Sequence, residues 1–133
     1  ETLLEHGQKV MEQAVDAGAK CAEELGATPE DLDKLAKREL PETKAGRCVI
    51  TCVNKIFGLQ NADGTIKKDS TLANVEEVKD IDEDVYKKMA SVWTTCSSNT
   101  VNDSDECNTG VNLAKCMKES SEKLGLTKDV IGF

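Results

Sequence analysis

The chain has 133 residues with 17 basic and 25 acidic side chains, so its formal net charge is −8 at pH 7. A chain of this length builds one domain, expected to span residues 1–133, and its 38% hydrophobic content is enough for one apolar core. The acidic balance without a Lys/Arg cluster excludes nucleic acid as a partner, and no apolar run is long enough for direct membrane insertion.

Two helices are expected in the first 40 residues. Thr2 and Glu5 form a capping-box pattern before an apolar stripe at steps of three and four, which predicts a first helix ending near Gly26. Thr28 is a predicted N-cap for a short second helix that stops before Pro41.

A third helix is expected from about Thr43 to Phe57, followed by Gly58 as a C-terminal glycine. Its apolar face includes Cys48 and Cys52, which are one turn apart and point the same way. The other members of this face are Val49, Val53 and Ile56.

Residues 58–69 predict a surface loop, because Asn61, Asp63 and Gly64 form a turn cluster. The same three residues resemble the middle of a calcium-binding EF-hand loop. The first and twelfth ligand positions of such a loop would be Leu59 and Ser70, so we favour the turn.

A fourth helix is expected to begin at Asp69 or Ser70 and to run through Val78, and Asp82 predicts the start of a fifth. The fifth helix has the clearest period in the chain, and residues 97–102 are expected to break it. Its apolar positions are Val85, Met89, Val92, Trp93 and Cys96.

Asp103 and Glu106 predict the start of a sixth helix, which would end before Gly125. Its apolar positions are Cys107, Val111, Ala114, Met117 and Leu124. Asn102 begins an N-glycosylation triplet, but we interpret this segment as a helix cap.

Six cysteines, an even number spread along the chain, indicate an oxidising compartment and hence a secreted protein. One histidine and the lack of a Cys-x-x-Cys pair argue against a metal site. Spacing alone leaves 15 possible pairings open.

The cysteine gaps carry a resemblance to a known family: 26, 3, 43, 10 and 8 residues separate Cys21, Cys48, Cys52, Cys96, Cys107 and Cys116. This spacing is similar to that of the insect odorant-binding proteins, the six-cysteine family of pheromone-binding and general odorant-binding proteins. The resemblance implies an all-α, disulfide-linked domain of six or seven helices around an apolar cavity. It also implies the pairs Cys21–Cys52, Cys48–Cys107 and Cys96–Cys116.

The resemblance further implies a carrier that takes a small hydrophobic ligand through sensillar lymph to a membrane olfactory receptor, as a monomer or weak dimer. An alternative is a secreted recognition protein that has no cavity and acts through its surface. An enzyme is not expected, because no catalytic set or cofactor motif can be assembled and His6 is expected to be an exposed residue of the first helix.

Aromatic residues make up only 3% of the chain, so the cavity should prefer flexible aliphatic ligands such as alcohols and esters. Asn74, Tyr86 and Ser91 are candidates for its polar group, and a solvent-facing Asn74 is an equally good interpretation. Asp129 could hold an apolar tail over the cavity, and a histidine switch is not expected. The residues expected to line the site are Met11, Val15, Ile56, Ile66, Leu72, Asn74, Val75, Val78, Tyr86, Met89, Val92, Trp93, Val111, Ala114, Met117, Val130 and Phe133.

Overall fold

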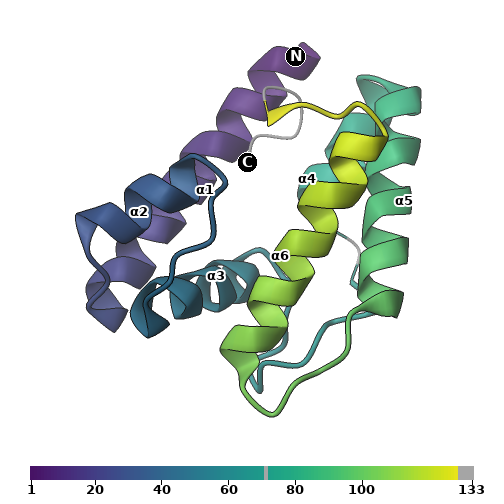
Figure 1. The fold of residues 1–133 in the computed structure, drawn as a ribbon. Coiled ribbons are helices and arrows are strands. Elements are labelled where there is room, and N and C mark those ends of the chain that lie inside the picture. Colours follow the sequence, from purple (N-terminus) through teal and green to yellow (C-terminus); the bar gives the residue numbers. More distant parts are fainter. Residues whose placement is uncertain (71, 129–133) are drawn as a thin grey trace.

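A computed structural model describes residues 1–70 and 72–128, and these residues form an all-α domain (Figure 1). The elements are α1 (Leu3–Leu25), α2 (Pro29–Ala36), α3 (Lys44–Ile56), α4 (Ala73–Glu76), the 3₁₀ helix η1 (Glu77–Asp80), α5 (Glu83–Asn99) and α6 (Glu106–Lys123). Within the described ranges the one β-type pairing is an isolated bridge between Gln60 and Ile66 in the loop after α3.

Local capping explains where most of the helices begin. Thr2 and Glu5 form a full capping box at α1, and Thr28 forms another with Asp31 at α2. Thr43 and Asp82 each accept a hydrogen bond from a first-turn N–H, at α3 and α5 respectively. These four helix starts confirm the sequence predictions.

The predicted start of the fourth helix is wrong. The Ser70 N–H donates to the Lys67 carbonyl in a turn, and Leu72 takes the N-cap position without any side-chain cap. The predicted single helix is only four residues of α4, continued by η1. The Val75 and Glu76 N–H groups donate to the Leu72 carbonyl, but no side chain caps the start of α4. A helix start without a side-chain cap is less stable, which is consistent with so short an element.

The junction between α5 and α6 also differs from prediction. Helix α5 continues to Asn99 rather than breaking at residue 97, and Asp105, not Asp103, is the N-cap of α6. Asp103 instead accepts the Asp105 N–H through its side chain, so it shapes the turn before the helix. Asn102 does not cap a helix either, because its Oδ1 accepts the Ile66 N–H at 2.9 Å.

Helix α3 lies between α1 and α6 and joins them covalently (Figure 1). The three disulfides are Cys21–Cys52 between α1 and α3, Cys48–Cys107 between α3 and α6, and Cys96–Cys116 between α5 and α6. They are the pairs that the family resemblance implies. Because Cys48 and Cys52 lie one turn apart, α3 reaches a different neighbour through each.

The contact of α3 with α6 is close enough to require a glycine. A Cβ built on Gly110 would collide with Thr51 Oγ1 and lie 2.9 Å from Gln60 Oε1. Thr51 donates its hydroxyl to the Glu106 carbonyl at 2.8 Å, and Arg47 donates to the Asn108 side chain. The two helices therefore meet through a buried polar contact next to their disulfide.

Polar groups connect α1 to α4 and η1. Asn74 Nδ2 donates to Gln13 Oε1 at 3.1 Å, and Lys9 Nζ donates to Glu77 Oε2 at 2.8 Å. Since α5 packs on both α6 and η1, these bonds complete a ring that runs from α1 through α3, α6, α5 and η1 back to α1. No helix in the described ranges has the length and apolar character needed to cross a membrane.

Candidate ligand-binding site

The largest apolar cluster of the molecule lies between α5, α6 and the loop after α3, and we call it the α5/α6 cluster. Its buried members are Leu59, Ile66, Val92, Trp93, Cys96, Leu113 and Leu126. Partly buried side chains pack against them: Phe57, Leu72, Val85, Met89, Cys116 and Met117. All of these are hydrocarbon, aromatic or sulfur side chains, and the thioethers of methionine adapt readily to irregular apolar shapes.

Helical spacing brings this cluster together. Met89, Val92, Trp93 and Cys96 recur at steps of three and four along α5, so they share one face. Cys96 is bonded to Cys116 of α6, which fixes the two helices side by side. The arrangement gives a mainly aliphatic environment around Trp93, with the Phe57 ring packed against its edge.

Six of the residues predicted to line the site lie in this cluster or pack against it. They are Ile66, Leu72, Met89, Val92, Trp93 and Met117. Val78 is also fully buried, on η1, which packs against α5. That these residues contact a ligand remains a prediction.

The remaining predicted residues are more scattered. Val15 and Ile56 are 62% and 51% exposed and lie outside the α5/α6 cluster. Met11, Val111 and Ala114 are half-buried on α1 and α6. Val130 and Phe133, like Asp129, lie outside the described residues.

Sequence reasoning missed three buried leucines, Leu59, Leu113 and Leu126. Leu113 is completely buried, whereas the predicted apolar residue Leu124 is 37% exposed. The signal was present, because Gly110, Leu113 and Met117 follow one another at steps of three and four on α6. Leu59 and Leu126 directly follow glycines with positive φ, where the chain turns back to the core.

The polar candidates have partners within the protein. Asn74 is half-buried, and its Nδ2 donates to Gln13 Oε1 in an exposed contact. Its role as a polar group of the ligand site remains a prediction. The Tyr86 hydroxyl donates to Glu76 Oε1 at 3.3 Å in an exposed contact, and Ser91 is exposed. Trp93 differs from them, because its buried indole Nε1 has no hydrogen-bond partner among the described residues.

A small groove of about 160 Å³ lies beside Trp93 where α4 meets α5. Its lining includes three predicted residues, Leu72, Val75 and Trp93. The other lining residues are Ser70, Glu76, Ala90 and Thr94. Polar and apolar groups contribute about equally to the surface of the groove, and it is smaller than the roughly 300–1,000 Å³ of typical small-molecule sites.

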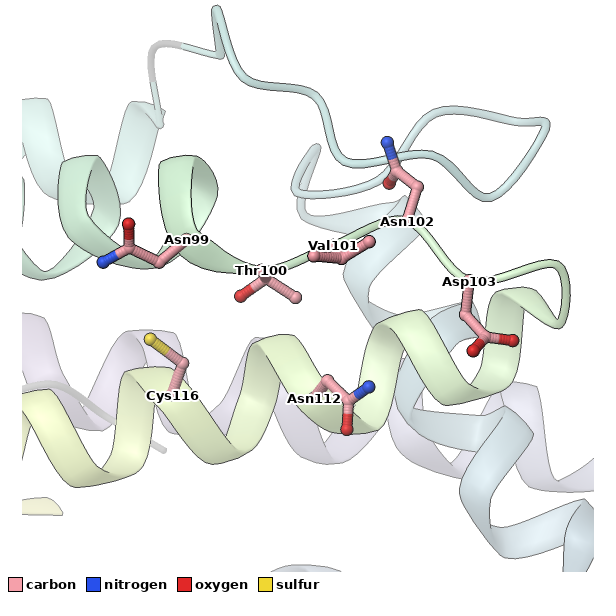
Figure 2. Close-up of a pocket in the computed structure, with 7 residues that line it drawn as sticks. All are labelled: Asn99, Thr100, Val101, Asn102, Asp103, Asn112 and Cys116. Carbon is pink, nitrogen blue, oxygen red and sulfur yellow. The ribbon is translucent and has the colours of Figure 1, made fainter.

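A second pocket, of about 390 Å³, lies between the α5–α6 connection and α6 (Figure 2). It contains none of the residues predicted to line the site. Its walls are Asn99, Thr100, Val101, Asn102, Asp103, Asn112 and Cys116. Figure 2 shows the connection running along α6, with Asn102 turned away from that helix. Four of its seven lining side chains are amides or a hydroxyl, but the surface that the lining residues present to the pocket is more apolar than polar. The pocket therefore offers both apolar surface and polar groups to a ligand.

The expected exposure of His6 is wrong, because the side chain is 1% exposed. The fold brings η1 over the first turns of α1, so that His6 Nε2 lies 3.2 Å from Glu77 Oε2. The Lys9 ammonium, and to a smaller extent His6, hold the pKa of Glu77 below its usual range.

Glu1, His6 and Glu77 place possible metal-ligand atoms within 4.8 Å of one another, although a metal site was not expected. Lys9 Nζ lies 2.8 Å from Glu77 Oε2 and 3.6 Å from Glu1 Oε2, so an ammonium already occupies the position between the two carboxylates. Sequence reasoning could not bring these groups together, since Glu77 is 71 residues from His6.

Comparison with known proteins places these features in a family. The family model described as "PBP/GOBP family" matches residues 4–120. General odorant-binding protein 28a of Drosophila melanogaster is 26% identical over 119 residues, which cover 90% of this chain and 82% of that protein. General odorant-binding protein 19d of the same species is 25% identical over 121 residues, covering 91% and 80%.

The solved structure of odorant-binding protein dmelOBP28a from Drosophila melanogaster has the same fold. It matches with a TM-score of 0.74 and 27% identity, over 91% of this chain and 99% of that one. The family match extends over most of the chain, and the helices and three disulfides agree with it. The chain therefore belongs to the PBP/GOBP family of insect odorant-binding proteins.

Proposed function

We propose that this protein is a secreted, single-domain carrier that takes up a small aliphatic ligand in an internal apolar site and carries it through aqueous fluid. Membership of an odorant-binding family, over residues 4–120, is the observation that carries the proposal. In that setting the fluid is sensillar lymph and the recipient is a membrane olfactory receptor.

The chemistry of the α5/α6 cluster supports an aliphatic ligand. Its members are leucine, isoleucine, valine, methionine and cystine side chains around Trp93, with Phe57 at its edge. Such walls can take up methylene groups, each worth about 0.8 kcal/mol when removed from water, but offer little stacking surface for a ligand ring. The half-buried Leu72, Met89 and Met117 at the edge of the cluster are the side chains that can move to admit a chain.

The disulfides support a site of this kind, because they hold the helices in place independently of the packing of the interior. A space that admits a ligand forfeits packing contacts, at about 24 cal/mol for each Å³ of cavity. Cys21–Cys52, Cys48–Cys107 and Cys96–Cys116 connect α1, α3, α6 and α5 into one covalent unit. This frame offsets the loss of packing.

Displacement of a fluorescent apolar probe tests the carrier function. The protein is expected to bind the probe at about one per chain and to release it to aliphatic competitors, with affinity rising as methylenes are added. A Leu113→Ala variant, altered at the centre of the α5/α6 cluster, should bind the longer competitors differently from the wild type. Lack of probe binding, or equal affinity for short and long competitors, would favour the recognition protein without a cavity.

A further inference from the structure

The indole N–H of Trp93 is a buried donor that has no acceptor within the described part of the chain. The side chain is 8% exposed, and Nε1 has no hydrogen-bond partner among the described residues. Tryptophan Nε1 can only donate, and a buried indole N–H normally finds a partner. Leaving such a group unsatisfied costs free energy, so an acceptor beyond the described residues is favoured at this position.

The surroundings of Trp93 identify it as a place for a ligand rather than for a protein partner. It packs in the α5/α6 cluster with Leu59, Ile66, Val92 and Leu113, none of which carries an oxygen or nitrogen in its side chain. Trp93 also lines the groove of about 160 Å³ at α4. An aliphatic chain placed among these side chains would bring any oxygen that it carries into the neighbourhood of the free N–H.

The other polar groups proposed for the site are already used. Asn74 donates to Gln13, and the Tyr86 hydroxyl donates to Glu76. Ser91 is exposed on the outer face of α5. Trp93 is thus the polar candidate on α4 and α5 that is both buried and unpaired.

Resting on the proposed carrier function, we propose that Trp93 is the polar anchor of the ligand site and that its indole N–H donates to a carbonyl oxygen of an aliphatic ketone, aldehyde or ester. A carbonyl oxygen accepts without bringing a donor of its own. An alcohol also brings an O–H. The side chains of the α5/α6 cluster offer no oxygen to accept it, whereas Ser70, Glu76 and Thr94 carry oxygens in the adjoining groove. An alcohol whose oxygen lies inside the cluster therefore keeps an unpaired donor, which weakens its binding. The ligand class is therefore the aliphatic carbonyl compound in preference to the alcohol of the same skeleton.

The test uses three competitors with one carbon skeleton, an alkane, the methyl ketone and the secondary alcohol, in displacement of the apolar probe. The three competitors differ in their free energy of transfer out of water, which affects their affinities whatever the site contains. The affinity of each competitor for Trp93→Phe is therefore compared with its affinity for the wild-type protein. Phenylalanine keeps an aromatic ring but removes the N–H. The variant is expected to lose about fivefold in affinity for the ketone relative to the alkane. Thr95→Val, which removes an exposed hydroxyl from the same helix, should leave the ratio of ketone to alkane affinity unchanged.

A measurement on the wild-type chain covers the case in which Trp93→Phe does not fold. The chain contains one tryptophan, so its indole N–H gives a single resonance in a ¹⁵N-labelled sample. The ketone is expected to move this resonance downfield as a hydrogen bond forms, and the alkane to leave it near its starting position.

Separate outcomes overturn the two proposals. Equal ketone-to-alkane ratios in the wild-type protein and Trp93→Phe, or an indole resonance that responds identically to both ligands, would remove Trp93 as the anchor while the carrier function stands. Tighter binding of the alcohol than of the ketone, after correction for partition, would show that the site supplies an acceptor and would also contradict the assignment. If the wild-type protein bound neither the probe nor any competitor, the carrier function itself would be wrong.

Discussion

The carboxylate of Asp31 joins the beginnings of two helices through Thr43. Its Oδ1 accepts the Thr43 hydroxyl at 2.8 Å, while its Oδ2 accepts the Thr28 N–H at 3.1 Å in the capping box of α2. Thr43 in turn accepts the Gly46 N–H as the N-cap of α3. The Thr28 backbone, followed by the Thr43 hydroxyl, holds the pKa of Asp31 below its usual range.

Asp31→Asn is expected to lower stability at pH 7 and to flatten the acid dependence of unfolding. A depressed pKa means that the ionised Asp31 stabilises the fold at neutral pH and that this contribution is lost as pH falls through the folded pKa. The wild-type protein should therefore lose stability below about pH 4, and the variant should lose less over the same range. Denaturant unfolding at several pH values measures this difference.

The matched control is Asp33→Asn, on the same helix, where the carboxylate pairs with Lys37 at the surface. Exposed pairs of this kind contribute little, so the control should follow the wild-type acid profile closely. An Asp31→Asn profile with the full wild-type slope would show that Asp31 is not responsible for it.

Gly110→Ala should destabilise the contact between α3 and α6. The new Cβ would collide with Thr51 Oγ1, and forced overpacking of this kind costs about 1–3 kcal/mol. Gly18→Ala in the middle of α1 is the control, because its Cβ would meet Leu32 at an ordinary 3.8 Å. That change should stabilise the helix by up to about 1 kcal/mol. Equal effects of the two substitutions on the unfolding midpoint would contradict this account.

The loss of stability on removing a disulfide should increase with the number of residues in the loop that the disulfide closes. Cys48 and Cys107 are 59 residues apart, whereas Cys96 and Cys116 are 20 apart. The chain-entropy relation gives losses of about 4 kcal/mol for the first pair and about 3 kcal/mol for the second when both cysteines are replaced by alanine. Denaturant titration of the two double variants gives the order directly, and the reverse order would refute an explanation based on loop length.

Glu77→Gln should loosen the contact between α1 and η1. The substitution removes the ion pair with Lys9 and weakens the bond to His6. Backbone amides of residues 72–81 are expected to exchange faster with solvent in this variant. Because the pKa of Glu77 is depressed, the ion pair is intact above the ordinary carboxyl pKa of about 4.3 and is lost as pH falls through the lower folded value.

The control for this experiment is Glu83→Gln. This substitution removes a carboxylate from an exposed ion pair with Lys87, one turn further along α5. It should leave exchange at residues 72–81 unchanged. If Glu77→Gln behaved like this control at neutral pH, the polar contact would contribute nothing to holding η1 on α1. The prediction that loss of ligand binding in acid does not involve His6 assumed that this side chain is exposed. Because His6 is buried beside Glu77, the pH dependence of binding has to be measured for a His6 variant as well.

Features that depend on neighbours in the sequence were predictable. Thr2, Thr28, Thr43 and Asp82 each cap a helix through bonds that span only three residues. The apolar faces of α3 and α5 follow from helical periodicity for the same reason.

Features that depend on distant parts of the chain were not predictable. His6 is buried next to Glu77, which is 71 residues away in the sequence. Asn102 accepts the N–H of Ile66, which is 36 residues away. Likewise, periodicity places Trp93 on an apolar face but says nothing of whether its N–H has an acceptor. That depends on every element around it.

The disulfides leave one segment outside the covalent frame. Helices α1, α3, α6 and α5 are connected by Cys21–Cys52, Cys48–Cys107 and Cys96–Cys116, but no cysteine lies between residues 53 and 95. Elements α4 and η1 are therefore held without a cross-link, and their contacts include packing on α5 and the polar bonds to α1. Partial unfolding of residues 72–80 strains no cross-link, so its free-energy cost lies below that of global unfolding. The molecule can thus open beside Trp93 while its remaining helices keep their positions.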